Sequence, residues 1–343
     1  MTPGLSPDLQ EISDVRKTAV INSELLRLKV DIAALQETRL AELGTLRESD
    51  YTFIWKGKGA DEVREHGVGF AIKNSLMQMV EPGEDGTERI YTLRLHTTDG
   101  PVTFVSAYAP TLYSSPDIKE EFYDQLQTVI RCVPSREPLI LLGDFNARVG
   151  ADHGSWSSCL GPFGIGLIND NGQRLLELCT LHSLCVTNTF FQTRPQHKVS
   201  WCHPRSKRWH QLDLVLTRRC HLQNVLITRS YHSADCDTDH SLVISKLRLC
   251  PKKLHQSKPP GKPRINTSRM SQQLSEEFRQ SSQSPSTPNH RTVTPTRDGV
   301  FFARPFTTLP SPSLANKRGS LLTGSRPIPT YLFPSQKEGG RPP

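Results

Sequence analysis

The sequence predicts a mixed α/β fold with many strands and a few helices between them. Apolar runs of strand length recur up to residue 250, and three stretches carry apolar residues at helical spacing. Proline use then changes, because 15 of the 26 prolines lie in residues 251–343. We therefore expect a disordered N-terminus over residues 1–14, a folded domain over residues 15–250, and a basic, Pro/Ser-rich disordered tail over residues 251–343.

Helical periodicity is clearest in residues 14–28, 114–133 and 171–184. The first stretch places Ile21, Leu25 and Leu28 on one face, with Ser13 as its candidate N-cap. The second has Pro116 near its start, where proline is tolerated. Its apolar stripe consists of Phe122, Leu126, Val129 and Val133.

The expected strands are short apolar runs that end at glycine, proline or polar residues. They are residues 30–35, 66–72, 89–95, 102–110, 138–142, 185–191, 212–216, 225–231 and 240–247. The run at 138–142 is apolar throughout after its proline, which is typical of a strand buried on both faces.

The net charge of +8 belongs to the tail, because residues 251–343 hold 15 Lys+Arg and only 4 Asp+Glu. Such a tail adheres weakly to polyanions and does not by itself indicate a nucleic-acid module. The eight cysteines form no CxxC pair, the first residues lack the features of a secretory signal, and no apolar run is long enough for a membrane span. We therefore expect free thiols, an intracellular setting and no membrane partner.

Polar residues stand where the expected strands end: Glu37, Tyr108, Asp144, Asn146, Asp213, Asp239 and His240. Taken singly, each has a structural explanation. Glu37 could start a helix, Tyr108 could be a half-buried strand aromatic, and Asp213 could pair with an arginine. His240 could be a structural histidine, and Asp144 with Asn146 could form an Asx-type turn. Their occurrence together favours a site.

The residue types match hydrolysis of a phosphodiester. Glu37 and Asp239 supply the oxygen ligands that Mg²⁺ prefers, and Mn²⁺ could substitute for it. Asp144 is the candidate base for the attacking water. Asn146 could steer that water or a phosphoryl oxygen, and Tyr108 could donate to a non-bridging oxygen.

His240 and Asp213 repeat the arrangement of a histidine oriented by a second carboxylate, as in hydrolytic triads. We expect His240, held by Asp213, to stabilise the phosphoryl transition state.

Five motifs occur in a fixed order: Q-E-T (36–38), S-A-Y-A-P (106–110), G-D-F-N (143–146), L-D-L-V-L (212–216) and T-D-H-S-L (238–242). Together they resemble the endonuclease/exonuclease/phosphatase superfamily. Within it, the chain is similar to the apurinic-type endonuclease domain of LINE retrotransposons and to the related craniofacial development protein 2-like group. Five ordered motifs are far more specific than any one of them.

The resemblance implies a DNase I-like fold, a four-layer α/β sandwich of two packed mixed sheets with its site in the loops at one end. It implies the same roles for the seven site residues as those given above. The family opens with a strand that ends in an Asn-Val-Arg-like motif. The sequence has no such apolar strand and no such Asn before the first expected helix, so we expect the first strand to be missing.

The stretch 194–219 indicates the substrate, because it holds seven Lys/Arg and one acid with two tryptophans and three histidines between them. Basic groups interleaved with aromatic rings suit DNA. The candidate contacts are Trp201, Arg205, Lys207, Arg208 and Trp209. The alternative is a solvated basic loop whose tryptophans pack against the edge of the sandwich.

The leading hypothesis is a Mg²⁺-dependent phosphodiesterase of retrotransposon origin that nicks DNA and leaves a 3′-hydroxyl. A catalytically silent, truncated nucleic-acid-binding remnant is the alternative, favoured by the missing Asn motif and opposed by retention of the other site residues. A phosphatase or lipid phosphodiesterase of the same fold is a third hypothesis, against which the basic and aromatic stretch speaks. We expect a monomer that acts in the nucleus.

Overall fold

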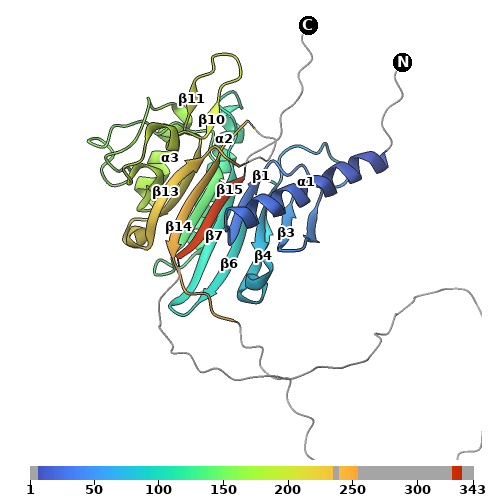
Figure 1. Cartoon of the computed structure of the whole chain (residues 1–343). Helices are drawn as coiled ribbons and strands as arrows, with labels where there is room; N and C mark the ends of the chain where they lie inside the picture. Colours follow the sequence, from blue (N-terminus) through green and yellow to red (C-terminus); the bar gives the residue numbers. More distant parts are fainter. Residues whose placement is uncertain (1–6, 235–238, 254–326, 334–343) are drawn as a thin grey trace, which may run out of the picture. The chain divides into compact units, whose positions relative to one another are not determined.

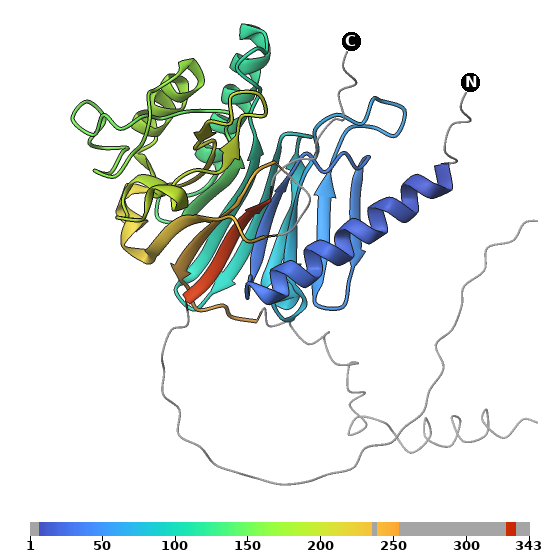
Figure 2. The same ribbon diagram turned by 45° about the horizontal axis from the view of Figure 1, so that its top comes forward.

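Two β-sheets packed face to face form the body of the molecule, with helices on their outer faces (Figures 1 and 2). The computed structural model describes residues 7–234, 239–253 and 327–333. The architecture confirms the predicted four-layer α/β sandwich.

The first sheet has seven strands, and β15 lies between β14 and β1 in the order β13-β14-β15-β1-β4-β3-β2. The bounds of these strands are Val225–Tyr231 (β13), Leu242–Arg248 (β14), Pro327–Phe333 (β15), Ile32–Gln36 (β1), Val68–Lys73 (β4), Tyr51–Lys56 (β3) and Leu43–Arg47 (β2). All pairings in this sheet are antiparallel except the one between β1 and β15.

The second sheet has six strands in the order β5-β6-β7-β8-β12-β9. Their bounds are Val80–Gly86 (β5), Ile90–Thr97 (β6), Gly100–Tyr108 (β7), Leu139–Asp144 (β8), Asp213–Arg218 (β12) and Leu184–Val186 (β9). The β7 and β8 strands are parallel, joined through a helix, and β12 pairs antiparallel with β8. A separate two-stranded hairpin is formed by β10 (Trp201–Cys202) and β11 (Trp209–His210).

Alternation of apolar residues along each strand explains the layers. In β8, Ile140 and Leu142 belong to the core between the sheets, whereas Leu139 and Leu141 contact the helices on the other face. The expected strand buried on both faces is therefore confirmed.

In the described part of the chain, three α-helices complete the outer layers. Helix α1 (Pro7–Arg27) covers the first sheet through a cluster that includes Leu25, and α2 (Pro116–Cys132) and α3 (Asp170–Leu181) cover the second. Ser115 caps α2 and Asn169 caps α3, because each side chain accepts a hydrogen bond from a backbone N–H of the first turn. Among the described residues, no helix has both the length and the apolar composition to cross a membrane.

Several elements differ from the prediction. Helix α1 begins at Pro7, so the prediction of a disordered N-terminus over residues 1–14 is wrong for residues 7–14, and Ser13 lies inside the helix and is not its N-cap. Strands β2, β3 and β5 and the β10–β11 hairpin were not predicted. Strand β2 is exposed on one face, and β10 and β11 have two residues each, so their apolar patterns are too weak or too short to detect.

The largest difference lies in the predicted tail. Residues 327–333 form β15 inside the first sheet, so the prediction of a disordered tail over 251–343 is wrong for this segment (Figure 1, red). Residues 251–253 are also described, and Pro251 forms a β-bridge to Thr97. The rest of the predicted tail and the first six residues of the predicted N-terminus lie outside the described residues.

Candidate active site

The pairing of β7, β8 and β12 brings three of the predicted site residues to one edge of the second sheet. Asp144, the last residue of β8, lies opposite Tyr108 in β7 and Asp213 in β12. Gly143 precedes Asp144, and a Cβ atom there would lie 2.2 Å from the carbonyl oxygen of Ala107. Glycine is therefore needed for the close approach of the two parallel strands that carry Tyr108 and Asp144.

His240 joins this edge from the loop before β14. Its Nδ1 lies 2.9 Å from Oδ2 of Asp213, and both side chains are almost fully buried. Burial alone would lower the pKa of His240, but the charge and hydrogen bond of Asp213, with Asp144 and Asp239 nearby, raise it to about 9. The pair is therefore an imidazolium held by a carboxylate.

Asp144 completes a compact group, since its carboxylate oxygen, an oxygen of Asp213 and a ring nitrogen of His240 all lie within 4.8 Å of one another. Burial and the charge of Asp213 raise the pKa of Asp144 to about 7, although His240 and the backbone N–H of Asn146 act in the opposite direction. The three residues therefore form a buried, coupled set of charges.

Asn146 adopts a left-handed backbone conformation, with φ of 47°. Its backbone N–H donates to Oδ1 of Asp144 at 2.9 Å, which is the Asx-type turn considered above. Its side-chain Nδ2 donates to the carbonyl of Ala109 at 3.0 Å. The Asx-type turn is therefore present, and Asn146 contacts Asp144 directly.

Glu37 follows the last residue of β1 and also has a left-handed backbone, with φ of 48°. The hydroxyl of Tyr108 donates to Oε1 of Glu37, and Arg39 lies 3.4 Å from Oε2. Burial and the Glu37 charge raise the pKa of Tyr108, so the phenol remains protonated. The contact links the first sheet to the second at the site edge, and the strained backbone of Glu37 is typical of functional positions.

Arg89 and His66 form part of this edge, and the sequence did not indicate either of them. Arg89 donates to the carbonyl oxygen of Tyr108 at 3.2 Å, and its guanidinium lies 5.5 Å from the centre of the Tyr108 ring. Arg89 Nη2 is 2.8 Å from Nε2 of His66. Because an arginine can only donate, His66 must accept at Nε2 and is neutral in this arrangement.

This arrangement predicts a pH dependence of stability. Burial and the Arg89 charge lower the pKa of His66 to about 4. The unfolded chain, with the ordinary histidine pKa, then binds a proton that the folded chain does not, so stability is full above the ordinary value and is lost as the pH falls toward 4. The loss is about 1–2 kcal/mol after allowance for solvent exposure of the ring.

The measurement is the free energy of unfolding of wild type and His66→Gln at several pH values. The two curves should run parallel above pH ~6.5 and the wild type should fall more steeply below it. If the free energies of unfolding of the two proteins run parallel over the whole acid range, the lowered pKa of His66 is contradicted.

Asp239 and Trp201 lie on the other side of His240. Trp201 Nε1 donates to Oδ2 of Asp239 at 3.0 Å, and Trp201 forms a β-bridge to His240. The Trp201 ring is half-buried among histidines. Of the two alternatives left open for Trp201, these contacts favour packing against the sandwich edge, and they give the residue a role in holding Asp239.

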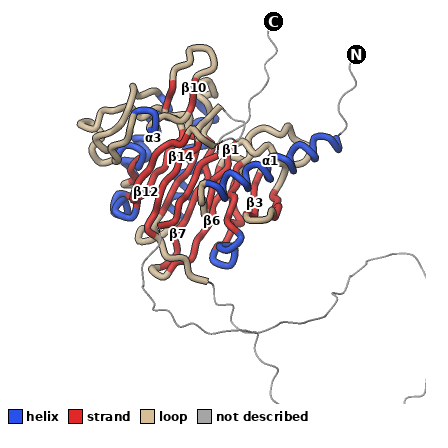
Figure 3. The backbone as a smooth tube through the Cα atoms, in the orientation of Figure 1, coloured by secondary structure: helices blue, strands red, loops and turns tan. Residues whose placement is uncertain are grey.

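The hairpin of β10 and β11 presents the remaining predicted contacts on a turn that stands out from the body (Figure 3). Arg205, Lys207 and Arg208 in this turn are exposed. Trp209 is 46 % exposed, and its ring packs edge-on against His232 with centroids 4.9 Å apart. The structure therefore gathers a basic, aromatic surface on one hairpin.

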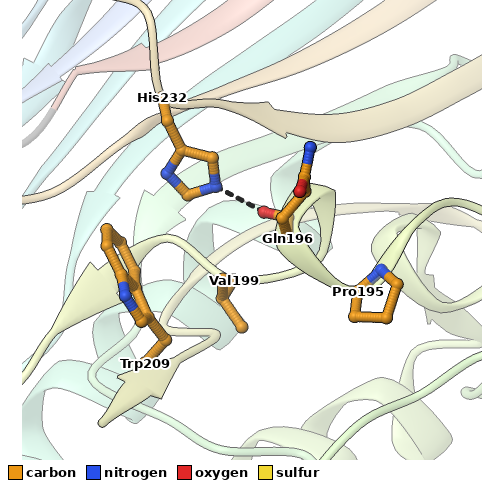
Figure 4. A pocket seen from close by; sticks show the side chains of 5 residues that line it. All are labelled: Pro195, Gln196, Val199, Trp209 and His232. Atoms are coloured by element: carbon orange, nitrogen blue, oxygen red, sulfur yellow. Dashed lines mark hydrogen bonds between the residues drawn. The ribbon is translucent and has the colours of Figure 1, made fainter. Parts of the chain in front are cut away.

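A pocket of about 390 Å³ lies at the base of this hairpin and is lined by Pro195, Gln196, Val199, Trp209 and His232 (Figure 4). His232 contacts the carbonyl of Gln196, and its Nδ1 lies 2.6 Å from the hydroxyl of Ser241. Since Ser241 follows His240, the pocket adjoins the buried charged group.

Asn171 is another residue that the sequence did not indicate. Asn169, two residues before it, caps α3. Asn171 is buried and donates from Nδ2 to the carbonyls of Pro110 and Asn146, at 3.1 and 3.0 Å. It therefore ties together the two loops that follow β7 and β8, a contact between distant segments that no local pattern could show.

A divalent metal ion fits the charge of this edge. The buried Oδ1 of Asp213 has no hydrogen-bond partner in the described part of the chain, and burial together with the neighbouring carboxylates raises the pKa of Asp144. Carboxylate oxygens are the donors that hard divalent cations prefer. The compact group of three does not include Glu37 or Asp239; their charges act on Asp144 and on His240, respectively.

The fold and this acidic group define a hydrolase of the nuclease and phosphatase type. The model of the Endonuclease/Exonuclease/phosphatase family matches residues 10–240, and the chain belongs to this family.

Relatives agree with this assignment. Craniofacial development protein 2 of Bos taurus is 28% identical over 233 residues, which are 68% of this chain and 39% of that protein. The protein of the same name from Tragulus javanicus is also 28% identical. The chain thus spans about two fifths of the length of these curated relatives.

Solved structures share the fold. The endonuclease domain of TRAS1, a telomere-specific non-LTR retrotransposon, superposes with a TM-score of 0.50 at 17% identity, over 68% of this chain and 93% of that domain. The catalytic domain of Xenopus laevis APE2 superposes with a TM-score of 0.50 at 16% identity, over 71% of this chain and 91% of that domain. The predicted DNase I-like fold is confirmed by this likeness.

Proposed function

We propose that the protein is a Mg²⁺-dependent phosphodiesterase that nicks DNA, derived from a retrotransposon endonuclease. The observation that carries the proposal is the buried group of Asp144, Asp213 and His240 beside an exposed basic hairpin. One structural neighbour is the endonuclease domain of a retrotransposon, which supports the same substrate class.

In this proposal Asp144 removes a proton from the water that attacks the phosphorus atom. The attack breaks the bond between phosphorus and the 3′ oxygen of the DNA, which takes up a proton and leaves as a 3′-hydroxyl. His240, kept charged and oriented by Asp213, stabilises the negative charge that develops on the phosphoryl oxygens. Asn146 binds the water or a phosphoryl oxygen through its side-chain oxygen or nitrogen.

Glu37 and Asp239 would hold Mg²⁺, or Mn²⁺ in its place. The ion would supply stabilisation of the charge that develops at the phosphate. Tyr108 and Trp201 position these two carboxylates, because each donates a hydrogen bond to one of them. For Tyr108 this positioning role replaces the direct phosphate contact predicted from the sequence.

Arg205, Lys207 and Arg208 would contact the DNA backbone, and Trp209 would stack on or insert beside a base at the mouth of the pocket. The protein would act as a monomer, and a DNA substrate would favour action in the nucleus.

The proposal is tested by incubating the full chain with supercoiled plasmid and Mg²⁺. We expect nicked circles that disappear on addition of EDTA and in the Glu37→Gln variant. The matched control is Glu42→Gln, since Glu42 has the same left-handed backbone but lies in the exposed loop before β2. Absence of nicking by a folded wild-type chain that still binds DNA would favour the silent nucleic-acid binder instead.

The exposed arginines of the hairpin make a separate prediction. Replacing Arg205 and Arg208 with alanine should weaken DNA binding and reduce the slope of log K against log salt by about 2, because each lost phosphate contact removes close to one released counterion. The matched control replaces the exposed Arg131 and Arg136, which precede β8 at its end remote from Asp144. An equal loss of DNA affinity in both double variants would show that the hairpin does not contact the DNA.

A further inference from the structure

The strand β15 occupies a central place in the first sheet, although it is far from its neighbours in sequence. It pairs with β1 on one side and with β14 on the other (Figure 1). Within the described residues, the half of the sheet formed by β13 and β14 is joined to the half formed by β1, β4, β3 and β2 through β15 alone. The sheet is therefore continuous only when this segment is in place.

The same strand joins the two sides of the candidate active site. Leu35, two residues before Glu37, pairs with Phe333, and Val243, three residues after His240, pairs with Leu332. Because β15 runs parallel to β1 and antiparallel to β14, its C-terminal end lies at the edge where β1 ends and β14 begins. The distance between Glu37 and the Asp239–His240 pair is thus set across one inserted strand.

The pairing of β15 is uneven along its length. Residues Thr330 to Phe333 pair with β1, whereas the N-terminal part, with Pro327 and Pro329, pairs with β14 only. Proline has no backbone N–H to donate and is tolerated where a strand forms a sheet edge. Only three residues, Thr330 to Leu332, therefore pair with both neighbouring strands.

Residues 254–326 separate β15 from the end of the preceding described segment, and closing a connection of this length costs only slightly more entropy than closing a shorter one. A strand that is paired on both sides over few residues, at the end of a long connection, can leave the sheet and re-enter it. The two halves of the sheet on either side of it can remain folded meanwhile.

We propose that the gap between β1 and β14 is a strand-binding site whose occupant is the chain's own segment 327–333, and that its occupation assembles the active site. The occupant binds by β-augmentation on both edges at once, mainly through backbone hydrogen bonds. Emptying the gap would expose the edges of two apolar strands, β1 and β14, which are otherwise paired. Only the part of the proposal that concerns activity rests on the proposed function.

The first test compares two full-length variants, Leu332→Pro and Leu314→Pro. Leu332 pairs with both neighbours, and proline there removes its N–H from the ladder, whereas Leu314 lies among residues 254–326. Amide hydrogen exchange in residues 32–36 and 242–248 should accelerate about tenfold or more in Leu332→Pro and remain unchanged in Leu314→Pro. Nicking should fall in parallel. Unchanged protection of both strands in Leu332→Pro would overturn the proposal.

A second test does not depend on a variant that folds poorly. A specific protease site is inserted after Ser313 in the full chain, and the purified protein is cut. The C-terminal fragment should remain bound after cutting and should be displaced by excess synthetic peptide of residues 325–335, but not by the same peptide with proline at position 332. If the fragment is lost while the amides of β1 and β14 remain protected from hydrogen exchange, the proposed strand-binding site is refuted.

A molecular mass of two chains before cutting would show exchange of β15 between copies and would overturn the assignment to the chain's own segment. If amide hydrogen exchange changes as expected but the wild type does not nick DNA, the strand-binding site stands and only the proposed function is refuted.

Discussion

Replacement of Asp144 with asparagine is expected to slow DNA nicking by about 10²–10⁴-fold, the range associated with loss of a positioned general base. Asparagine keeps the shape of the side chain and can still accept the hydrogen bond from the Asn146 backbone N–H. It cannot accept a proton from water. The effect should therefore appear in the rate of the chemical step and leave the DNA affinity close to that of the wild type.

The measurement is single-turnover nicking at saturating protein, with DNA binding measured separately by titration in the absence of Mg²⁺. The matched control is Asp124→Asn, because Asp124 is an exposed aspartate on the outer side of α2. A nicking rate within a few-fold of the wild type in Asp144→Asn would exclude Asp144 as the base.

The second large effect is expected for Asp213→Asn. Asp213 holds His240 through a 2.9 Å contact, and its charge is the largest of those that raise the pKa of the buried imidazole. Asparagine removes that charge, so His240 loses both its orientation and its preferred protonation state. Nicking should fall by about 10²–10³-fold, as expected when a group that stabilises the transition-state charge is lost.

The control for Asp213→Asn must be a buried carboxylate outside the site, because removal of any buried ion pair also lowers stability. Glu137 serves this purpose: it is 7 % exposed and binds Arg94 at 2.8 Å and the Thr103 hydroxyl. Glu137→Gln should lower the free energy of unfolding and leave kcat unchanged at a temperature where the protein is folded. A loss of kcat in proportion to stability in both variants would show that Asp213 has only a structural role.

The sequence predicted the elements whose apolar pattern is local. The strand β13 has the predicted bounds, and β1, β4, β6, β7, β8, β12 and β14 agree within a few residues. The predicted partnership of His240 with Asp213 is also present. These successes share a cause, since hydrophobic periodicity and ordered motifs are written in consecutive residues.

The features that the sequence did not predict depend on contacts between distant segments. Nothing near Arg89 or Asn171 in the sequence indicated that one would hold Tyr108 and the other would join two loops, because both roles are created by strand order. For Trp201 the sequence allows two roles, and only the structure shows that its indole N–H donates to Asp239. The composition around residues 327–333 resembles the rest of the tail, so composition alone assigned the segment to disorder.

By itself the sequence determined the class of fold and the family, and it predicted which acids and histidine would form the candidate site, because these follow from residue types in a fixed order. Only the tertiary structure decided which of them lie together, that Tyr108 and Trp201 each position a carboxylate, and that a strand from the C-terminal region completes the first sheet. The physical reason is that a β-sheet is stabilised by hydrogen bonds between strands of any separation along the chain, and no local pattern records which strand will be the neighbour.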